Sequence, residues 1–104
     1  MDKKIKKLNE FELINLVKRV KNIENKLFDT WDLSKAEINY LPIEVINLIK
    51  DETCRLALSY NKLCELPNEI LQLSKLRYLN LRANSFTQVP LIVKFILYLH
   101  SYFC

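Results

Sequence analysis

Three segments of this chain repeat one arrangement of apolar and polar positions. The copies begin at Trp31, Leu56 and Leu79, so their starts lie 25 and then 23 residues apart. Apolar residues occupy positions 1, 3, 8 and 11 of each copy. Proline follows at position 12 of every copy, at Pro42, Pro67 and Pro90. The alternation at positions 1 and 3 predicts a short strand with one buried face, and the uneven spacing of the later positions predicts a turn back toward the interior.

The period is typical of leucine-rich repeats, in which each coil buries its leucines only by stacking on its neighbours. We therefore predict an α/β fold: a short leucine-rich-repeat solenoid of about three coils, with parallel strands on its concave face. The residues between copies support it, since Ile70, Leu73 and Leu76 recur every third residue, as on one side of a short helix. A generic helical bundle is the alternative, but it would not place strand-like pairs, asparagines and prolines in register.

Asparagine occupies position 6 in two of the copies, at Asn61 and Asn84. There we expect the side-chain amide to satisfy backbone groups where the strand bends away, because such groups would otherwise be buried without a partner. The first copy has Ala36 at this position, so its turn must be satisfied in another way.

The N-terminal segment has helical periodicity and carries the net charge of the chain. Residues 1–28 contain eight Lys or Arg and four Asp or Glu, a net charge of +4, whereas residues 29–104 contain eight of each. Most apolar residues of the segment fall on one side at helical spacing, with no proline or glycine between them. We predict an amphipathic helix that caps the N-terminal end of the solenoid. The alternative is a basic helix that lies on an anionic membrane or on a partner.

We divide the chain into three parts. Residues 1–28 form the capping helix, residues 29–93 hold the repeats, and residues 94–104 form an apolar C-terminal tail. Eleven of the fourteen residues from 91 to 104 are apolar, and the sequence ends where a further strand would begin. Fourteen residues are too few for a membrane-spanning helix, which needs about 20. We therefore expect this tail to mark a truncated part of a longer repeat protein.

The composition argues against several kinds of site. With no glycine the chain has neither a Rossmann fingerprint nor a P-loop. The cysteines lack CxxC spacing, and with the single His100 they make no credible zinc site. We expect Cys54, Cys64 and Cys104 to be buried free thiols, in keeping with a reducing cytosol and a cytoplasmic protein.

No arrangement of residues indicates catalysis. Ser59 and Cys64 have no histidine at a plausible neighbouring position, and the adjacent Asp51 and Glu52 are expected to be solvated in a polar loop. We expect a non-enzymatic protein without catalytic, cofactor-binding or metal-binding residues. The charge of +4 is too small and too local to indicate a nucleic-acid partner.

The residues that alternate with the buried leucines, Ser59 among them, are expected to face outward on the concave side. Tyrosine and arginine are the residues that most often anchor protein interfaces. We predict that Arg55, Tyr60, Tyr78 and Arg82 form one adjacent cluster across two coils. The predicted protein-binding residues are Lys35, Arg55, Tyr60, Tyr78, Asn80 and Arg82. The alternative is a solvated face without a particular partner.

Two longer runs are more specific than the generic repeat. They are Leu73-Ser-Lys-Leu-Arg-Tyr-Leu-Asn-Leu-Arg-Ala-Asn-Ser-Phe-Thr-Gln-Val-Pro90 and Glu44-Val-Ile-Asn-Leu-Ile-Lys-Asp-Glu-Thr-Cys-Arg-Leu-Ala-Leu-Ser-Tyr-Asn61. Together they resemble the N-terminal repeats of the fungal leucine-rich-repeat scaffold of the RAM network, called the morphogenesis Orb network in fission yeasts. The resemblance covers roughly residues 29–93, and residues 1–28 match the helix that precedes those repeats. Residues 94–104 depart from it, since the family continues into further coils.

The resemblance implies a function. The family is a non-enzymatic cytoplasmic adaptor that associates with a germinal-centre-type protein kinase, in a network that controls polarised growth and cell morphogenesis. Two alternatives remain open. One is the leucine-rich-repeat section of a larger enzyme, such as a fungal adenylyl cyclase that receives a small GTPase. The other is a peripheral membrane protein that makes its contact through residues 1–28.

Overall fold

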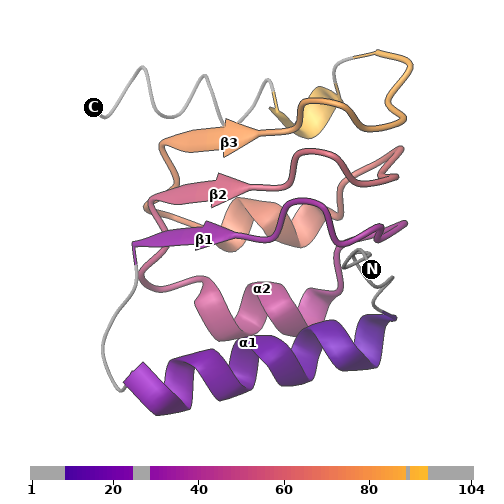
Figure 1. Cartoon of the computed structure of the whole chain (residues 1–104). Helices are drawn as coiled ribbons and strands as arrows, with labels where there is room; N and C mark the ends of the chain where they lie inside the picture. Colours follow the sequence, from indigo (N-terminus) through magenta and orange to yellow (C-terminus); the bar gives the residue numbers. More distant parts are fainter. Residues whose placement is uncertain (1–8, 25–28, 89, 94–104) are drawn as a thin grey trace.

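The computed structural model describes residues 9–24, 29–88 and 90–93 and shows a small mixed α/β fold (Figure 1). Its elements are α1 (Glu10–Glu24), β1 (Thr30–Asp32), α2 (Ile43–Ile49), β2 (Arg55–Ala57), the 3-10 helix η1 (Asn68–Gln72) and β3 (Tyr78–Asn80). The strands form one parallel sheet in the order β1-β2-β3. Figure 1 shows them stacked one above another, with α1 beneath α2.

The register of the sheet follows the sequence repeat. Leu56 pairs with Trp31 on one side and with Leu79 on the other, so position 1 of each copy is aligned. Backbone hydrogen bonds continue this alignment of the copies beyond the strands. Leu33 N donates to Ala57 O at 2.8 Å, and Leu58 N donates to Asn80 O at 2.8 Å. The prediction of three parallel strands in register with the repeat is confirmed.

Each proline of the first two copies begins a helical segment. Pro42 and Pro67 have extended backbones, and their carbonyls accept the amides of Val45 and Ile70 at 3.1 Å each. Proline suits this position because it has no amide of its own to satisfy at a helix start. The second segment is the 3-10 helix η1, whose three residues per turn match the apolar period of three.

The core is made of the apolar positions of the repeat and the helical segments between them. In copies 1 and 2 all four pattern positions are buried. In copy 3, Leu79, Leu81 and Phe86 are partly buried and pack against the same core, while Val89 lies outside the described residues. The fully buried side chains include Val45, Ile46, Ile49, Leu58, Leu63 and Ile70. Burying each such side chain stabilises the fold by about 1.5–3 kcal/mol.

Helix α1 starts at a capping box. Asn9 N donates to Glu12 Oε1 at 3.1 Å, and Glu12 N donates to Asn9 Oδ1 at 2.8 Å. This reciprocal pair satisfies two amides that the first turn of a helix leaves without a partner. Of the helix predicted over residues 1–28, the structure shows the part from Glu10 to Glu24. Residues 1–8 and 25–28 lie outside the described part of the chain.

Among the described residues, α2 covers one side of α1. Leu13 and Val17 are buried and lie one turn apart, on the side that packs against α2. Phe11 is 69% exposed. Phe11 is not among the residues of the covered side, because two residues of helix turn its side chain about 200° away from Leu13.

An ion pair joins α1 to the chain that follows α2. Lys21 Nζ lies 3.1 Å from Glu52 Oε2, without hydrogen-bond geometry, and Lys21 also donates a hydrogen bond to the Leu48 carbonyl. Glu52 is only 8% exposed. The prediction that Asp51 and Glu52 are both solvated is therefore wrong for Glu52, since the docking of α1 covers it.

Candidate protein-binding face

The face that displays the predicted binding residues is supported by the two repeat asparagines. Asn61 is buried, and its Oδ1 accepts the amides of Ala36 at 3.0 Å and Ile38 at 3.2 Å. Its Nδ2 donates to the carbonyls of Leu33 at 3.1 Å and Leu58 at 2.9 Å. The amide of Asn61 thus satisfies the turn of copy 1, where alanine stands in place of asparagine, as well as part of its own turn.

Asn84 repeats this arrangement one copy later. Its Oδ1 accepts the amide of Leu63 at 2.9 Å, and its Nδ2 donates to the carbonyls of Leu58 at 2.9 Å and Leu81 at 3.1 Å. The Leu58 carbonyl therefore accepts from both Asn61 and Asn84. The two asparagines form a ladder that links the three turns.

The residue before each asparagine position has a left-handed backbone. Lys35, Tyr60 and Ala83 occupy position 5 of the three copies and have φ values of 59°, 57° and 58°. Non-glycine residues rarely adopt this conformation because of the close approach of Cβ to the following carbonyl. The asparagine ladder holds this left-handed conformation, although the chain contains no glycine. The conformation turns the side chains of Lys35 and Tyr60 out to solvent.

Two cation–aromatic pairs cross between neighbouring copies on this face. Lys35 Nζ lies 5.7 Å from the ring centroid of Tyr60, between copies 1 and 2. The guanidinium carbon of Arg55 lies 4.8 Å from the ring centroid of Tyr78, which is its register partner on β3. Tyr60 is 49% exposed and Tyr78 is 58% exposed, so both rings keep a free surface.

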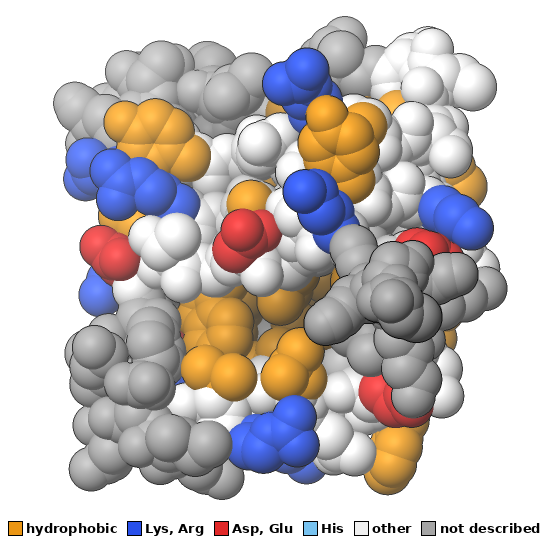
Figure 2. Space-filling model, in the orientation of Figure 1, with side chains coloured by type: hydrophobic (Ala, Val, Ile, Leu, Met, Phe, Trp, Pro, Cys, Tyr) orange, Lys and Arg blue, Asp and Glu red, His pale blue; other side chains and the backbone are white. Residues whose placement is uncertain are grey.

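The predicted binding residues form two groups, whereas the sequence predicted one adjacent cluster. Arg55 and Tyr78 lie where the strands begin. Tyr60 lies in the turn after the strand, and its amide donates to the Arg82 carbonyl at 2.9 Å, which places Arg82 beside it. The groups are separate because Arg55 and Tyr60 stand at opposite ends of one extended segment. Figure 2 shows basic side chains beside hydrophobic ones at two places on the strand side of the molecule.

Asn80 also shapes the backbone of this face. Its Oδ1 accepts the amide of Arg82 at 3.0 Å, as Asp32 accepts the amide of Ser34 at 3.0 Å in copy 1. Ser59 is buried and donates to Ser34 Oγ at 2.9 Å, so the expectation that it faces the solvent is wrong. A shallow hollow of about 480 Å³ lies at the group of Arg55 and Tyr78 and is lined by Thr30, Arg55, Leu56, Ala57, Tyr78, Leu79, Asn80 and Leu81.

The cysteines do not match their expected burial. Cys64 is exposed and Cys54 is half-buried, and both are free thiols. Cys64 stands at position 9 of its copy, which is not one of the buried pattern positions 1, 3, 8 and 11, and its side chain is therefore exposed. Cys104 and His100 lie outside the described residues. Within residues 9–24, 29–88 and 90–93, no group of three His, Cys, Asp or Glu side chains could hold a metal ion.

The comparisons with known proteins give one informative similarity. No family model matches the chain. The chain is 40% identical over 67 residues to the leucine-rich repeat-containing protein sog2 of Schizosaccharomyces pombe. The match covers 64% of this chain and 7% of that protein. None of the described helices is both long enough and apolar enough to span a membrane. The similarity supports the relation to fungal leucine-rich repeat proteins.

Proposed function

We propose that this chain is a non-enzymatic protein-binding module, built as a leucine-rich-repeat solenoid of three coils with α1 as its N-terminal cap. Its partner binds the concave face formed by β1, β2, β3 and the turns that follow them. The observation that carries the proposal is the pair of cation–aromatic contacts, Lys35 with Tyr60 and Arg55 with Tyr78.

Several contacts support the solenoid. The asparagine ladder links turns of adjacent copies, and the strands align the copies position by position. Helix α1 covers the first helical segment with Leu13 and Val17, as expected for a cap. In a solenoid such contacts are made only between neighbouring coils, so stability comes from stacking.

The chemistry of the face supports protein binding. Tyrosine and arginine offer a large contact area together with hydrogen-bonding groups, and both are enriched at the energetic centres of interfaces. Each of the two pairs restricts the motion of its side chains before a partner arrives, which reduces the ordering cost of binding. The remaining charged groups of the face, Arg82 and Asp32, lie within the same surface and would define its polar rim.

For the cellular role, we propose an adaptor in a fungal kinase network that controls polarised growth and cell morphogenesis. The proposed partner is a germinal-centre-type protein kinase in the cytoplasm. This role rests on the resemblance of residues 44–61 and 73–90 to the scaffold family and on the similarity to sog2. The chain spans 7% of the length of that relative, so the role is proposed for the protein to which these repeats belong.

A triple substitution tests the proposed face. In Tyr60→Ala/Tyr78→Ala/Arg82→Ala, each cation–aromatic pair loses its ring, and a basic group is removed. The matched control is Phe11→Ala/Leu71→Ala/Lys75→Ala, which removes two exposed large apolar side chains and one basic group elsewhere. Co-precipitation of the tagged chain with the germinal-centre-type kinase of the same genome is expected to disappear with the first variant and to persist with the second.

The result can refute the proposal in two ways. Retention of the kinase by the first variant would show that the concave face is not the binding surface. Failure of the unsubstituted chain to retain this kinase would refute the assigned partner. Thermal unfolding of both variants is measured in parallel, and equal midpoints show that a lost interaction does not reflect unfolding.

A further inference from the structure

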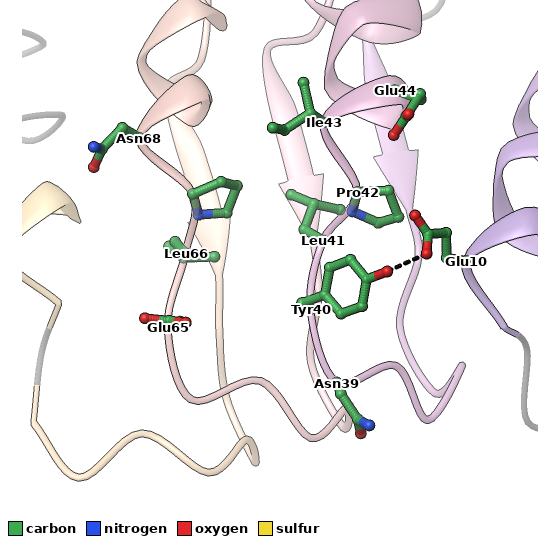
Figure 3. A pocket seen from close by; sticks show the side chains of 11 residues that line it. Glu10, Asn39, Tyr40, Leu41, Pro42, Ile43, Glu44, Glu65, Leu66 and Asn68 are labelled. Carbon is green, nitrogen blue, oxygen red and sulfur yellow. Dashed lines mark hydrogen bonds between the residues drawn. The ribbon is translucent and has the colours of Figure 1, made fainter.

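A second hollow of about 820 Å³ lies away from the strands, where the chain enters α2 and η1 (Figure 3). Two equivalent stretches of consecutive copies form it, residues 39–44 and residues 65–68, and Glu10 of α1 closes one side. Figure 3 shows these three segments side by side, with Tyr40 and Glu10 directed toward one another. This groove includes none of the residues of the proposed binding face.

The charge of the groove is opposite to that of the chain. It is lined by the carboxylates of Glu10, Glu44 and Glu65, and none of its described lining residues is basic. The chain as a whole carries a formal charge of +4. The three carboxylates come from three separate segments, and the described residues offer no group of acids suited to a metal ion. An extended ligand with several separated positive charges fits this distribution better than a single cation.

The groove also has exposed apolar surface. Tyr40 is 48% exposed and Ile43 is 43% exposed, and both line it together with Leu66 and the two prolines. An exposed aromatic ring and an exposed branched aliphatic side chain in a concave site are typical anchors for an apolar side chain of a partner. The acidic residues then surround this apolar surface.

Tyr40 is held in place by α1. Its hydroxyl donates a hydrogen bond to Glu10 Oε1 across 30 residues of sequence. This bond, followed by partial desolvation and by the charges of Glu10 and Glu44, raises the pKa of Tyr40. The phenol therefore remains a neutral donor at physiological pH, and the ring stays oriented between the acidic side chains.

We propose that this groove binds an extended peptide segment of a partner protein in which lysine or arginine residues flank an apolar residue. The apolar residue contacts Tyr40 and Ile43, and the basic residues pair with Glu10, Glu44 and Glu65. Charge complementarity of this kind speeds association and selects against acidic and neutral segments. The repeats would then hold two partners, one on each surface.

The test uses the full chain and a fluorescent pentapeptide, Lys-Lys-Leu-Lys-Lys, with anisotropy as the readout at low salt. The comparison peptides are Glu-Glu-Leu-Glu-Glu and Lys-Lys-Ser-Lys-Lys. The groove variant is Glu44→Gln/Glu65→Gln, and the control Asp51→Asn/Glu69→Gln removes the same charge outside the groove lining. We expect saturable binding of the lysine–leucine peptide, about tenfold weaker in the groove variant, unchanged in the control, and weakened by salt.

Three outcomes would overturn the proposal. One is the absence of saturable binding, and another is an equal loss in the groove variant and the control. The third concerns the lysine-rich N-terminus of the chain. If the peptide binds only after Lys3, Lys4, Lys6 and Lys7 are replaced by glutamine, the occupant is this segment and the partner peptide is excluded. Weak binding of both comparison peptides would complete the support, because it shows that charge and the apolar residue are both needed.

Discussion

Removal of the Asn61 amide tests whether the turns are linked as the structure shows. In Asn61→Ala, the amides of Ala36 and Ile38 lose their acceptor, and the carbonyl of Leu33 loses its donor. Ala36 and Ile38 are buried, so water cannot easily replace the lost partner. Each orphaned buried group costs about 1–3 kcal/mol, and two orphaned amides together imply a loss of about 2–6 kcal/mol of unfolding free energy.

Asn84→Ala provides the internal comparison. Asn84 is only partly buried, and a single amide, that of Leu63, loses its acceptor. We expect a smaller loss of about 1–3 kcal/mol. Because Asn61 and Asn84 donate to the same Leu58 carbonyl, the double variant should also depart from the sum of the single effects.

The unfolding free energies of both variants are measured by urea unfolding followed by circular dichroism. The midpoints can be compared when the slope m is the same across the series. The expected order is a lower midpoint for Asn61→Ala than for Asn84→Ala. Equal losses in the two variants, or a loss below about 1 kcal/mol for Asn61→Ala, would refute the argument from orphaned buried groups.

Three further changes probe other parts of the structure. Ala83→Gly should raise the unfolding free energy by about 0.5–1 kcal/mol because the left-handed backbone at Ala83 favours glycine, whereas Ala57→Gly in β2 should lower it by a similar amount; a loss in both variants contradicts this reasoning. Lys21→Met leaves the carboxylate of Glu52 buried without its partner and should cost about 2–3 kcal/mol, with faster hydrogen exchange in α1 as the readout; unchanged exchange would show that the pair does not hold the helix. The pKa of Tyr40 is raised, so its hydrogen bond contributes below pH 10 and is lost as the phenol ionises above it. The difference between the ultraviolet titrations of the unsubstituted chain and Tyr40→Phe should show Tyr40 ionising above pH 10, and ionisation below pH 10 would contradict the observed bond.

The sequence predicts most of the fold because the repeat encodes it locally. Positions 1 and 3 predict the strands, and the period of three after Pro67 matches the 3-10 geometry of η1. The repeat does not encode contacts between distant segments. Glu52 is buried because α1 packs over it, and Asn61 serves the turn of the preceding copy, 25 residues earlier. Neither relation leaves a periodic signal in the sequence.

The sequence predicts the outward position of the proposed binding residues, but it predicts one cluster instead of two groups. Arg55 and Tyr60 lie five residues apart, at opposite ends of one extended segment, so the groups that they join are separate. The groove at Tyr40 had no sequence signal at all. Its acidic character depends on Glu10 and Glu65, which lie 30 residues before and 25 residues after Tyr40 in the sequence.

The backbone of Tyr60 connects the fold with the proposed function. A left-handed tyrosine costs about 1–2 kcal/mol relative to an unstrained backbone, and its half-exposed ring contributes little to the core. Strained residues of this kind cluster at functional sites, where the surrounding structure holds them in place. The ladder supplies that support on either side of Tyr60, because Asn84 bonds both the Leu58 carbonyl and the Leu63 amide. The energy that the ladder adds to the fold therefore allows an aromatic ring to stand beside Lys35, at a position where stability alone would favour glycine.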